Sequence, residues 1–331
     1  MSLLINGKMQ EDWFDKVSDE GEFVRKDSQF RHWITADGTA GPTGDAGFAA
    51  EKDRYHLYVS YACPWAQRTL IFRKLKNLED MISISVVHPF MGHHGWDFNT
   101  DFPGTTGDTL YHASQLHELY TQAQADYSGI VTVPVLWDKK LKTIVNNESA
   151  EIIRMFNNAF NHLIEDKAAR ELDFYPEEKR PAIDAINEHV YDNINNGVYR
   201  AGFATTQESY EHGYHRLFKA LDDLEEILGQ QRYLAGNSIT EADWRLFVTL
   251  IRFDAVYVGH FKCNKKRIID YPNLFNYMLE LYQWPGIKET TYIDHIKHHY
   301  YASHEMINPS RIVPLGPEQN LEQKHNRGQI A

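Results

Sequence analysis

A strand-like run passes directly into a helix-like run at Tyr58-Val59-Ser60-Tyr61-Ala62-Cys63-Pro64-Trp65-Ala66-Gln67-Arg68. Residues 56–60 are typical of a short strand, and residues 66–76 contain many good helix formers. Pro64 suits the first helical position, because a backbone N–H would be unpaired there in any case. We therefore expect Cys63 at the N-terminus of a helix, where the helix dipole and the N–H groups favour a thiolate.

A buried, unreactive thiol is the alternative interpretation of Cys63, because most free cysteines behave as small hydrophobic residues. The turn favours a nucleophile, with a pKa well below that of an ordinary thiol. A C-x-x-C redox motif would need a second cysteine at Ala66, and the other cysteine of the chain is the distant Cys263. A sulfur without a local partner passes its mixed disulfide to an external thiol, and glutathione is the natural candidate.

The composition indicates a globular protein. The chain has 331 residues, a length that is enough for two domains. Of these residues, 42% are hydrophobic and 13% aromatic, which is typical of a globular protein. Its formal net charge of −12 argues against a general attraction to nucleic acid or to an anionic membrane. The sequence has no signal peptide or membrane-length apolar run, and its two cysteines suit a reducing compartment, so we expect a cytoplasmic protein. The 17 histidines lack metal-ligand spacing, and no metal is expected.

Three parts are expected along the chain: an N-terminal arm over residues 1–50, a domain over residues 51–165 and a helical domain over residues 166–331. The arm is rich in glycine and is not expected to form a core alone. In the second part we predict strands over 56–60, 82–88, 133–137 and 142–145, and helices after Cys63, over 109–125 and from Glu148. A β-α-β unit followed by a hairpin and a closing helix is the order of an α/β thioredoxin-like domain.

The third part shows helical periodicity. Apolar residues recur at helical spacing over 183–194 and 210–228, with Gly229 as the expected stop. Thr240 and Asp243 predict a capping box, so Asp243 is interpreted as a structural residue. Pro272 is expected to open a further helix, and the tail from residue 308 is expected to be irregular.

A thioredoxin-like domain followed by an all-α domain resembles the glutathione transferase architecture. The segment 132–136, Thr-Val-Pro-Val-Leu, resembles the place where that superfamily has a cis proline, which leaves the preceding backbone able to pair with an extended peptide. Asn147-Glu148-Ser149-Ala150 resembles its γ-glutamyl site, in which Ser149 would meet the carboxylate and Glu148 the amino group. Taken alone, Glu148 and Ser149 are equally consistent with a helix cap.

A closer resemblance, to the omega-like glutathionyl-hydroquinone reductases or Xi-class glutathione transferases, covers nearly the whole chain, from residues 30–35 to residues 303–309. It is carried by Cys63-Pro64-Trp65-Ala66, Gly95-Trp96, Glu148-Ser149-Ala150-Glu151, Asn195-Asn196-Gly197-Val198-Tyr199 and Val256-Tyr257-Val258-Gly259-His260-Phe261. It implies that Cys63 attacks the sulfur of a glutathionyl-hydroquinone and that the hydroquinone leaves. A second glutathione then attacks the Cys63 mixed disulfide and releases oxidised glutathione.

The resemblance also gives roles to four aromatic residues. It implies Tyr199 as the acid that protonates the leaving carbon, and Tyr257 and Tyr300 as hydroxyls near the sulfur that stabilise a thiolate. It implies that Trp96 packs on glutathione. Without the resemblance, each of these residues would be assigned to the core.

Further glutathione contacts are implied along Ile130, Val131, Thr132 and the main chain of Val133. The family commonly has a basic residue at the position of Ile130, where it is available to a glutathione carboxylate. This chain cannot make an ionic contact there.

The sequence therefore predicts glutathione as co-substrate, aromatic quinone-derived conjugates as substrates and a homodimer, with no nucleic acid or membrane partner. A conjugating transferase is disfavoured, because it keeps glutathione's own thiolate as the nucleophile, whereas Cys63 would trap it as a disulfide. A general monothiol glutaredoxin-like thiol transferase, or a dehydroascorbate reductase, is the alternative function, because it shares the monothiol chemistry.

Overall fold

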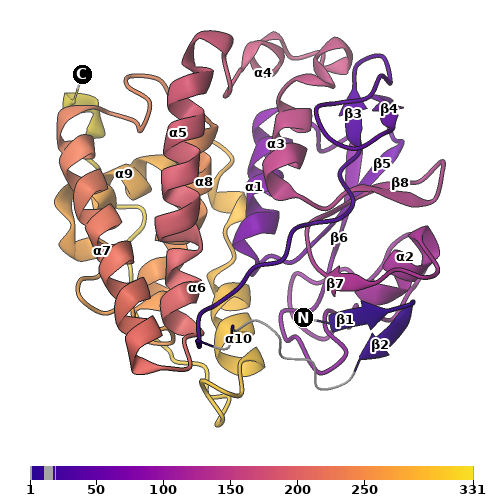
Figure 1. Ribbon diagram of the computed structural model, residues 1–331. Coiled ribbons are helices and arrows are strands. Elements are labelled where there is room, and N and C mark those ends of the chain that lie inside the picture. The colour runs from indigo at the N-terminus through magenta and orange to yellow at the C-terminus, as the bar shows by residue number, and fades with distance from the viewer. Residues whose placement is uncertain (1, 11–17, 19, 331) are drawn as a thin grey trace. The chain divides into compact units, whose positions relative to one another are not determined.

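The computed structural model describes residues 2–10, 18 and 20–330, and these form two compact units (Figure 1). Of the described residues, the first unit contains 2–10 and 26–173, and the second contains 18, 20–25 and 174–330. The N-terminal segment therefore contributes to both units. The domain boundaries expected from the sequence stay predictions.

The first unit is built on a mixed four-stranded sheet. Its described strands are β1 (Ser2–Ile5), β2 (Lys8–Gln10), β3 (Trp33–Thr35), β4 (Gly47–Ala49), β5 (Tyr55–Val59), β6 (Ile82–Val86), β7 (Gly129–Val131), β8 (Val135–Asp138) and β9 (Thr143–Asn146). Its described helices are α1 (Pro64–Leu75), α2 (Leu116–Ala123), α3 (Ser149–Asn158), η1 (Asn161–Leu163) and α4 (Lys167–Glu171). The sheet has the order β6-β5-β8-β9, with β5 parallel to β6 and antiparallel to β8.

The central strand β5 is buried along its whole length, as expected for a strand covered on both faces. Its one imidazole, His56, places Nδ1 2.7 Å from Ser83 Oγ and Nε2 2.9 Å from Ser85 Oγ, both on β6. The order β5-α1-β6, hairpin β8–β9 and closing helix α3 confirms the predicted order of elements. Helices α1 and α3 pack against each other.

One local prediction in the first unit is wrong. The helix expected from residue 109 begins only at Leu116, because the Asp108 carboxylate accepts the N–H groups of Leu110, Tyr111 and Ala113 and holds a turn instead. In its described residues the arm contributes four strands that the sequence did not indicate: β1 pairs with β2 and with β7, and β3 pairs with β4.

The second unit is helical in its described residues. Its elements are η2 (Glu177–Lys179), α5 (Arg180–Val190), η3 (Tyr191–Asn195), α6 (Gly197–Gly202), α7 (Gln207–Gln230), α8 (Glu241–Arg252), η4 (Phe253–Tyr257), η5 (Ile268–Asp270), α9 (Pro272–Tyr282), η6 (Lys288–Thr290), α10 (Ile293–Ser303) and η7 (Arg327–Gln329). The predicted capping box of Thr240 and Asp243 is confirmed. Asp243 also accepts hydrogen bonds from the Tyr277 hydroxyl at 2.7 Å and the Leu234 N–H at 2.9 Å, which fits its structural role.

Gly229 does not end α7, which continues to Gln230. A Cβ at position 229 would lie 3.0 Å from Asn273 Nδ2, so the missing side chain lets the start of α9 approach α7 closely. The predicted start of a helix at Pro272 is confirmed. None of the helices in the described ranges is long and apolar enough to cross a membrane.

Burial of His56 predicts a pH-dependent stability. Burial lowers the pKa of His56 from 6.5 to about 3, so between these values the unfolded chain binds a proton that the folded protein excludes. The free energy of unfolding should therefore fall by up to about 1.4 kcal/mol for each pH unit below 6.5 from this residue alone. Urea titrations at pH 7.0, 6.0 and 5.0 should show a shallower decline for His56→Gln than for the unchanged protein. Equal slopes would contradict the prediction.

Candidate active site

Cys63 lies at the junction of β5 and α1, as predicted. It is the N-cap residue of α1, with extended backbone angles (φ −76°, ψ 123°), and Pro64 follows at the first helical position. The residue is 9% exposed. Its Sγ lies 3.6 Å from the carbonyl oxygen of Val133, so the thiol can donate a weak hydrogen bond there. The sulfur therefore sits beside both the helix N-terminus and the segment that we expect to bind glutathione.

The Val133–Pro134 peptide bond is cis, as the resemblance implied. The preceding residue, Thr132, is held through its backbone by the hydroxyl of Tyr120 on α2. That hydroxyl donates to the Thr132 carbonyl at 2.8 Å and accepts from the Thr132 N–H at 3.2 Å. Val131 is buried at the end of β7. Tyr120 was not singled out in the sequence, because nothing local to it indicates this contact.

Glu148 and Ser149 lie at the N-terminus of α3. Glu148 is the N-cap residue, and its Oε1 accepts the N–H of Ala150 at 3.0 Å. Ser149 is the first helical residue and is buried, and its Oγ has no hydrogen-bond partner among the described residues. A buried hydroxyl without a partner is costly unless a ligand satisfies it, and at a helix N-terminus a carboxylate is favoured. The motif thus acts as a helix cap and also has the chemistry of an anion site.

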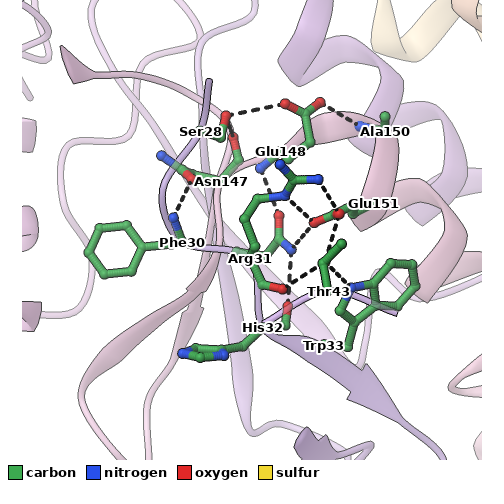
Figure 2. A network of polar contacts seen from close by, with 11 residues as sticks. Ser28, Phe30, Arg31, His32, Trp33, Thr43, Asn147, Glu148, Ala150 and Glu151 are labelled. Atoms are coloured by element: carbon green, nitrogen blue, oxygen red, sulfur yellow. Dashed lines mark hydrogen bonds and ion pairs between the residues drawn. The ribbon is translucent and has the colours of Figure 1, made fainter. Parts of the chain in front are cut away.

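A polar network surrounds this helix N-terminus (Figure 2). Its partners come from the segment 28–33, from Thr43 and from the end of β9. Arg31 forms a two-point ion pair with Glu151, with Nε 2.7 Å from Oε2. Asn146 and Thr43 donate to the same carboxylate, each at 2.7 Å. Residues 30–33 belong to a segment that carries the family resemblance, but the sequence does not predict these contacts.

Trp96 and Ile130 were also predicted to contact glutathione. Trp96 is 4% exposed, and its carbonyl accepts the N–H of Leu116 at the start of α2. Ile130 is half-buried in β7, where it pairs with Leu3 of β1. Its carbonyl accepts the hydroxyl of Tyr127 at 3.1 Å. The segment 130–133 is thus fixed through its backbone, whichever side chain stands at position 130.

In the second unit, the structure brings the three predicted tyrosines together. Tyr199 lies on α6, Tyr257 is the last residue of the π-helical turn η4, and Tyr300 lies on α10. The Tyr300 hydroxyl lies 2.7 Å from that of Tyr199 and 3.1 Å from that of Tyr257. Burial raises the pKa of Tyr257 and Tyr300 well above the ordinary value of a phenol. These two groups therefore stay protonated at neutral pH and can act as hydrogen-bond donors.

Phe261 holds the three tyrosine rings in place. Its ring centroid lies 5.6 Å from that of Tyr199, 5.5 Å from that of Tyr257 and 5.6 Å from that of Tyr300. A Cβ at Gly202 would lie 2.1 Å from Phe261 Cγ, so only glycine leaves room for this ring. Phe261 is part of residues 256–261, which carry the family resemblance, but the resemblance implies no role for it.

The N-terminal segment reaches the same cluster. Phe23 stacks on Tyr199 with 5.7 Å between ring centroids, and the guanidinium of Arg25 lies 5.4 Å from the centroid of the Tyr199 ring. Arg25 is anchored by a 2.9 Å hydrogen bond from Nε to Asn196 Oδ1. The sequence did not predict these contacts.

The second cysteine has a different environment. Cys263 is fully buried in the second unit, and burial raises the pKa of its thiol. No group of three or more histidine, cysteine or acidic side chains lies close enough to hold a metal ion in the part of the chain that the structure describes.

Comparison with known proteins agrees with this geometry. Residues 62–159 match the family model of the glutathione S-transferase N-terminal domain, and residues 207–280 match that of the C-terminal domain. The chain is 57% identical over 327 residues to glutathionyl-hydroquinone reductase YqjG of Escherichia coli K12, covering 99% of this chain and 98% of that protein. It is 50% identical to glutathionyl-hydroquinone reductase PcpF of Sphingobium chlorophenolicum, covering 97% and 98%. This chain belongs to the glutathionyl-hydroquinone reductases.

The chain is also similar to solved structures of glutathione transferases, including one of the Xi class. The glutathione-bound structure of YqjG superposes with a TM-score of 0.90 at 55% identity, covering 98% of this chain and 99% of that one. A Xi-class glutathione transferase from Natrialba magadii gives a TM-score of 0.90 at 46% identity, covering 100% and 98%. The predicted fold class, an α/β thioredoxin-like domain followed by an all-α domain, is confirmed, and so is the resemblance from which the family was inferred.

The two cysteines of this glutathionyl-hydroquinone reductase should differ sharply in reactivity. Iodoacetamide should label Cys63 with an apparent pKa below the ordinary value near 8.5, because the α1 N-terminus favours the thiolate. Cys263 should stay unlabelled in the folded protein, because burial raises its thiol pKa. Peptide mass spectrometry across pH 5 to 10, with urea-unfolded protein as the control, checks both statements. Equal labelling of both residues would contradict them.

Proposed function

We propose that this protein uses glutathione to reduce glutathionyl-hydroquinones to hydroquinones, with Cys63 as the nucleophile. The observation that carries the proposal is the place of Cys63 at the start of α1, 3.6 Å from the Val133 carbonyl that precedes the cis proline. A thiolate there can attack a glutathione sulfur bound along residues 130–133. Membership of the family supports this assignment.

The reaction proceeds by two successive nucleophilic attacks on a glutathione sulfur. The Cys63 thiolate attacks the sulfur of the conjugate, the bond between that sulfur and the aryl carbon breaks, and its electron pair passes to the carbon. The carbon takes a proton and leaves as hydroquinone, and a Cys63–glutathione disulfide remains. The thiolate of a second glutathione attacks this disulfide at the glutathione sulfur, so oxidised glutathione leaves and the Cys63 thiolate is restored. Overall, one conjugate is reduced and two glutathione moieties end as the disulfide.

Glutathione is bound mainly by the first unit in this proposal. The buried Ser149 hydroxyl and the α3 N-terminus receive the γ-glutamyl carboxylate, which satisfies the unpartnered Oγ. Glu148 receives the γ-glutamyl ammonium. The backbone of Val133, with Ile130, Val131 and Thr132, pairs with the extended peptide. Trp96 contributes an apolar contact.

The tyrosines act as donors in this scheme. Tyr199 protonates the leaving carbon, and the hydrogen bond to Tyr300 allows its proton to be replaced from the next hydroxyl. Tyr257 and Tyr300 stabilise the thiolate as neutral donors, which agrees with their raised pKa values. We further propose aromatic quinone-derived conjugates as the substrates, a homodimer as the assembly and the cytoplasm as the location.

Replacing the cysteines tests the nucleophile. Cys63→Ser should abolish the release of hydroquinone and of oxidised glutathione while the protein stays folded, because a serine hydroxyl is far less acidic than a thiol. Cys263→Ser is the matched control and should leave the rate unchanged. Substantial activity in the Cys63 variant would refute the mechanism. Turnover of a glutathionylated peptide faster than of a glutathionyl-hydroquinone would favour the general thiol transferase instead.

Replacing single hydroxyls tests the tyrosines. Tyr199→Phe keeps the ring, so the melting temperature should change little, whereas kcat should fall by roughly 10- to 1,000-fold, the range of general acid catalysis. Tyr257→Phe and Tyr300→Phe should raise the Cys63 thiol pKa in the alkylation assay.

Tyr277→Phe is the control for these three variants, because Tyr277 is also buried but donates to the structural Asp243. It should lower the melting temperature and leave kcat unchanged. If kcat and thiol pKa are unchanged in all three active-site variants, the tyrosines are core residues.

A further inference from the structure

We propose that Ser28 is a positioning residue for glutathione: its hydroxyl fixes the Glu148 carboxylate in the orientation that receives the γ-glutamyl ammonium. The inference rests on the proposed function, in which Glu148 binds that ammonium. It extends the site to a part of the chain far from the glutathione-binding motifs in sequence.

The N-terminal segment lies against the end of β9 and the start of α3 (Figure 2). Arg31 pairs with Asn146 in an antiparallel bridge. Asn147 donates its N–H to the Phe30 carbonyl at 3.1 Å, and its Oδ1 accepts the Phe30 N–H at 3.2 Å. These backbone contacts fix the path of the segment and bring Ser28 Oγ to 3.2 Å from Glu148 Oε2. The same hydroxyl lies 3.2 Å from the Asn147 carbonyl, an alternative acceptor for its one proton.

Both oxygens of Glu148 are therefore held, and each keeps a lone pair for a ligand. Oε1 accepts the Ala150 N–H, and Oε2 accepts the Ser28 hydroxyl. Each carboxylate oxygen can accept two hydrogen bonds, and an ammonium carries three donors. A carboxylate whose rotamer is already fixed loses less entropy when it binds a cation. The Ser28 hydroxyl thus fixes the orientation of the Glu148 carboxylate and leaves lone pairs on it that can accept hydrogen bonds from the ammonium.

The charge of Glu148 is also left for the ligand. Arg31 is near enough to interact electrostatically with Glu148, but its guanidinium is bound at two points by Glu151. Burial alone would raise the pKa of Glu151, but hydrogen bonds from Arg31, Asn146 and Thr43 outweigh burial and lower it. Glu151 therefore stays ionised at neutral pH and retains Arg31.

Helix capping alone does not explain a glutamate at position 148. Ser, Thr, Asp and Asn are the preferred N-cap residues, because their short side chains reach the first-turn N–H groups. Among the described residues, the Glu148 side chain caps the N–H of Ala150 alone, and its second oxygen faces the Ser28 hydroxyl. A longer carboxylate held from two sides suits a binding role.

The test compares two thiols as the second nucleophile, glutathione and its deaminated analogue glutaryl-cysteinyl-glycine. Ser28→Ala should lower kcat/KM for glutathione by about 5- to 10-fold, the effect of one lost hydrogen bond, mostly through KM. It should change kcat/KM for the analogue little, because the analogue has no ammonium. Ser28→Thr, which keeps the hydroxyl, should retain the preference for glutathione. If Ser28→Ala does not fold, Ser28→Cys keeps the volume with a weaker donor and should move in the same direction.

Thr43→Val is the matched control, because it removes a hydroxyl from the same network that reaches Glu151 rather than Glu148. It should lower the melting temperature without changing the preference between the two thiols. Equal losses for both thiols in Ser28→Ala, or no loss, would overturn the inference.

Calorimetric binding of both peptides separates this inference from the proposed function. If Glu148→Gln changes the preference for glutathione and Ser28→Ala does not, only the inference fails. If glutathionyl-hydroquinone is not turned over, the proposed activity is wrong. The calorimetric comparison of the two peptides still tests the role of Ser28 in that case.

Discussion

The hydroxyl of Tyr120 joins the two loops of the first unit that recognise glutathione in our proposal. It donates to the carbonyl of Thr132, next to the cis peptide bond, and accepts from the backbone N–H of the same residue and from the Asn147 side chain at 3.1 Å. Burial raises the pKa of this phenol, so it remains a neutral donor. One buried group thus sets the spacing between residues 130–133 and the start of α3. A buried network that is fully satisfied resists distortion, because each broken bond leaves an unpaired polar atom.

The sequence predicted the parts of the structure that depend on neighbours in the chain. The helix start after Cys63 follows from Pro64 and the residues beyond it, and the capping box of Thr240 and Asp243 follows from their spacing. Where a side chain competes with a helix for backbone N–H groups, as Asp108 does, the local pattern was misleading. The prediction that Gly229 ends α7 is wrong for another reason: the missing side chain allows the close approach of α9 and does not end the helix.

The contacts that the sequence did not predict join residues far apart in the chain. Ser28 and Glu148 are separated by 120 positions, and Arg25 and Asn196 by 171. Neither helical periodicity nor a capping motif can predict such pairs, because they form only when the N-terminal segment packs on the folded units. The tyrosines were an intermediate case. Their assignment came from family resemblance, and the hydroxyl chain from Tyr199 through Tyr300 to Tyr257 became visible only in the structure.

The N-terminal segment lies outside both family-wide domains, whose matches begin at residues 62 and 207. Yet residues 23 and 25 touch Tyr199, and residues 28–31 hold the start of α3. Relatives with similar sequences in these two domains can therefore still differ in the contacts that support the α3 N-terminus and the Tyr199 ring. During evolution, substitutions in residues 23–31 can change substrate selectivity while the two domains stay unchanged. Sequence comparisons confined to the domains would overlook such a change.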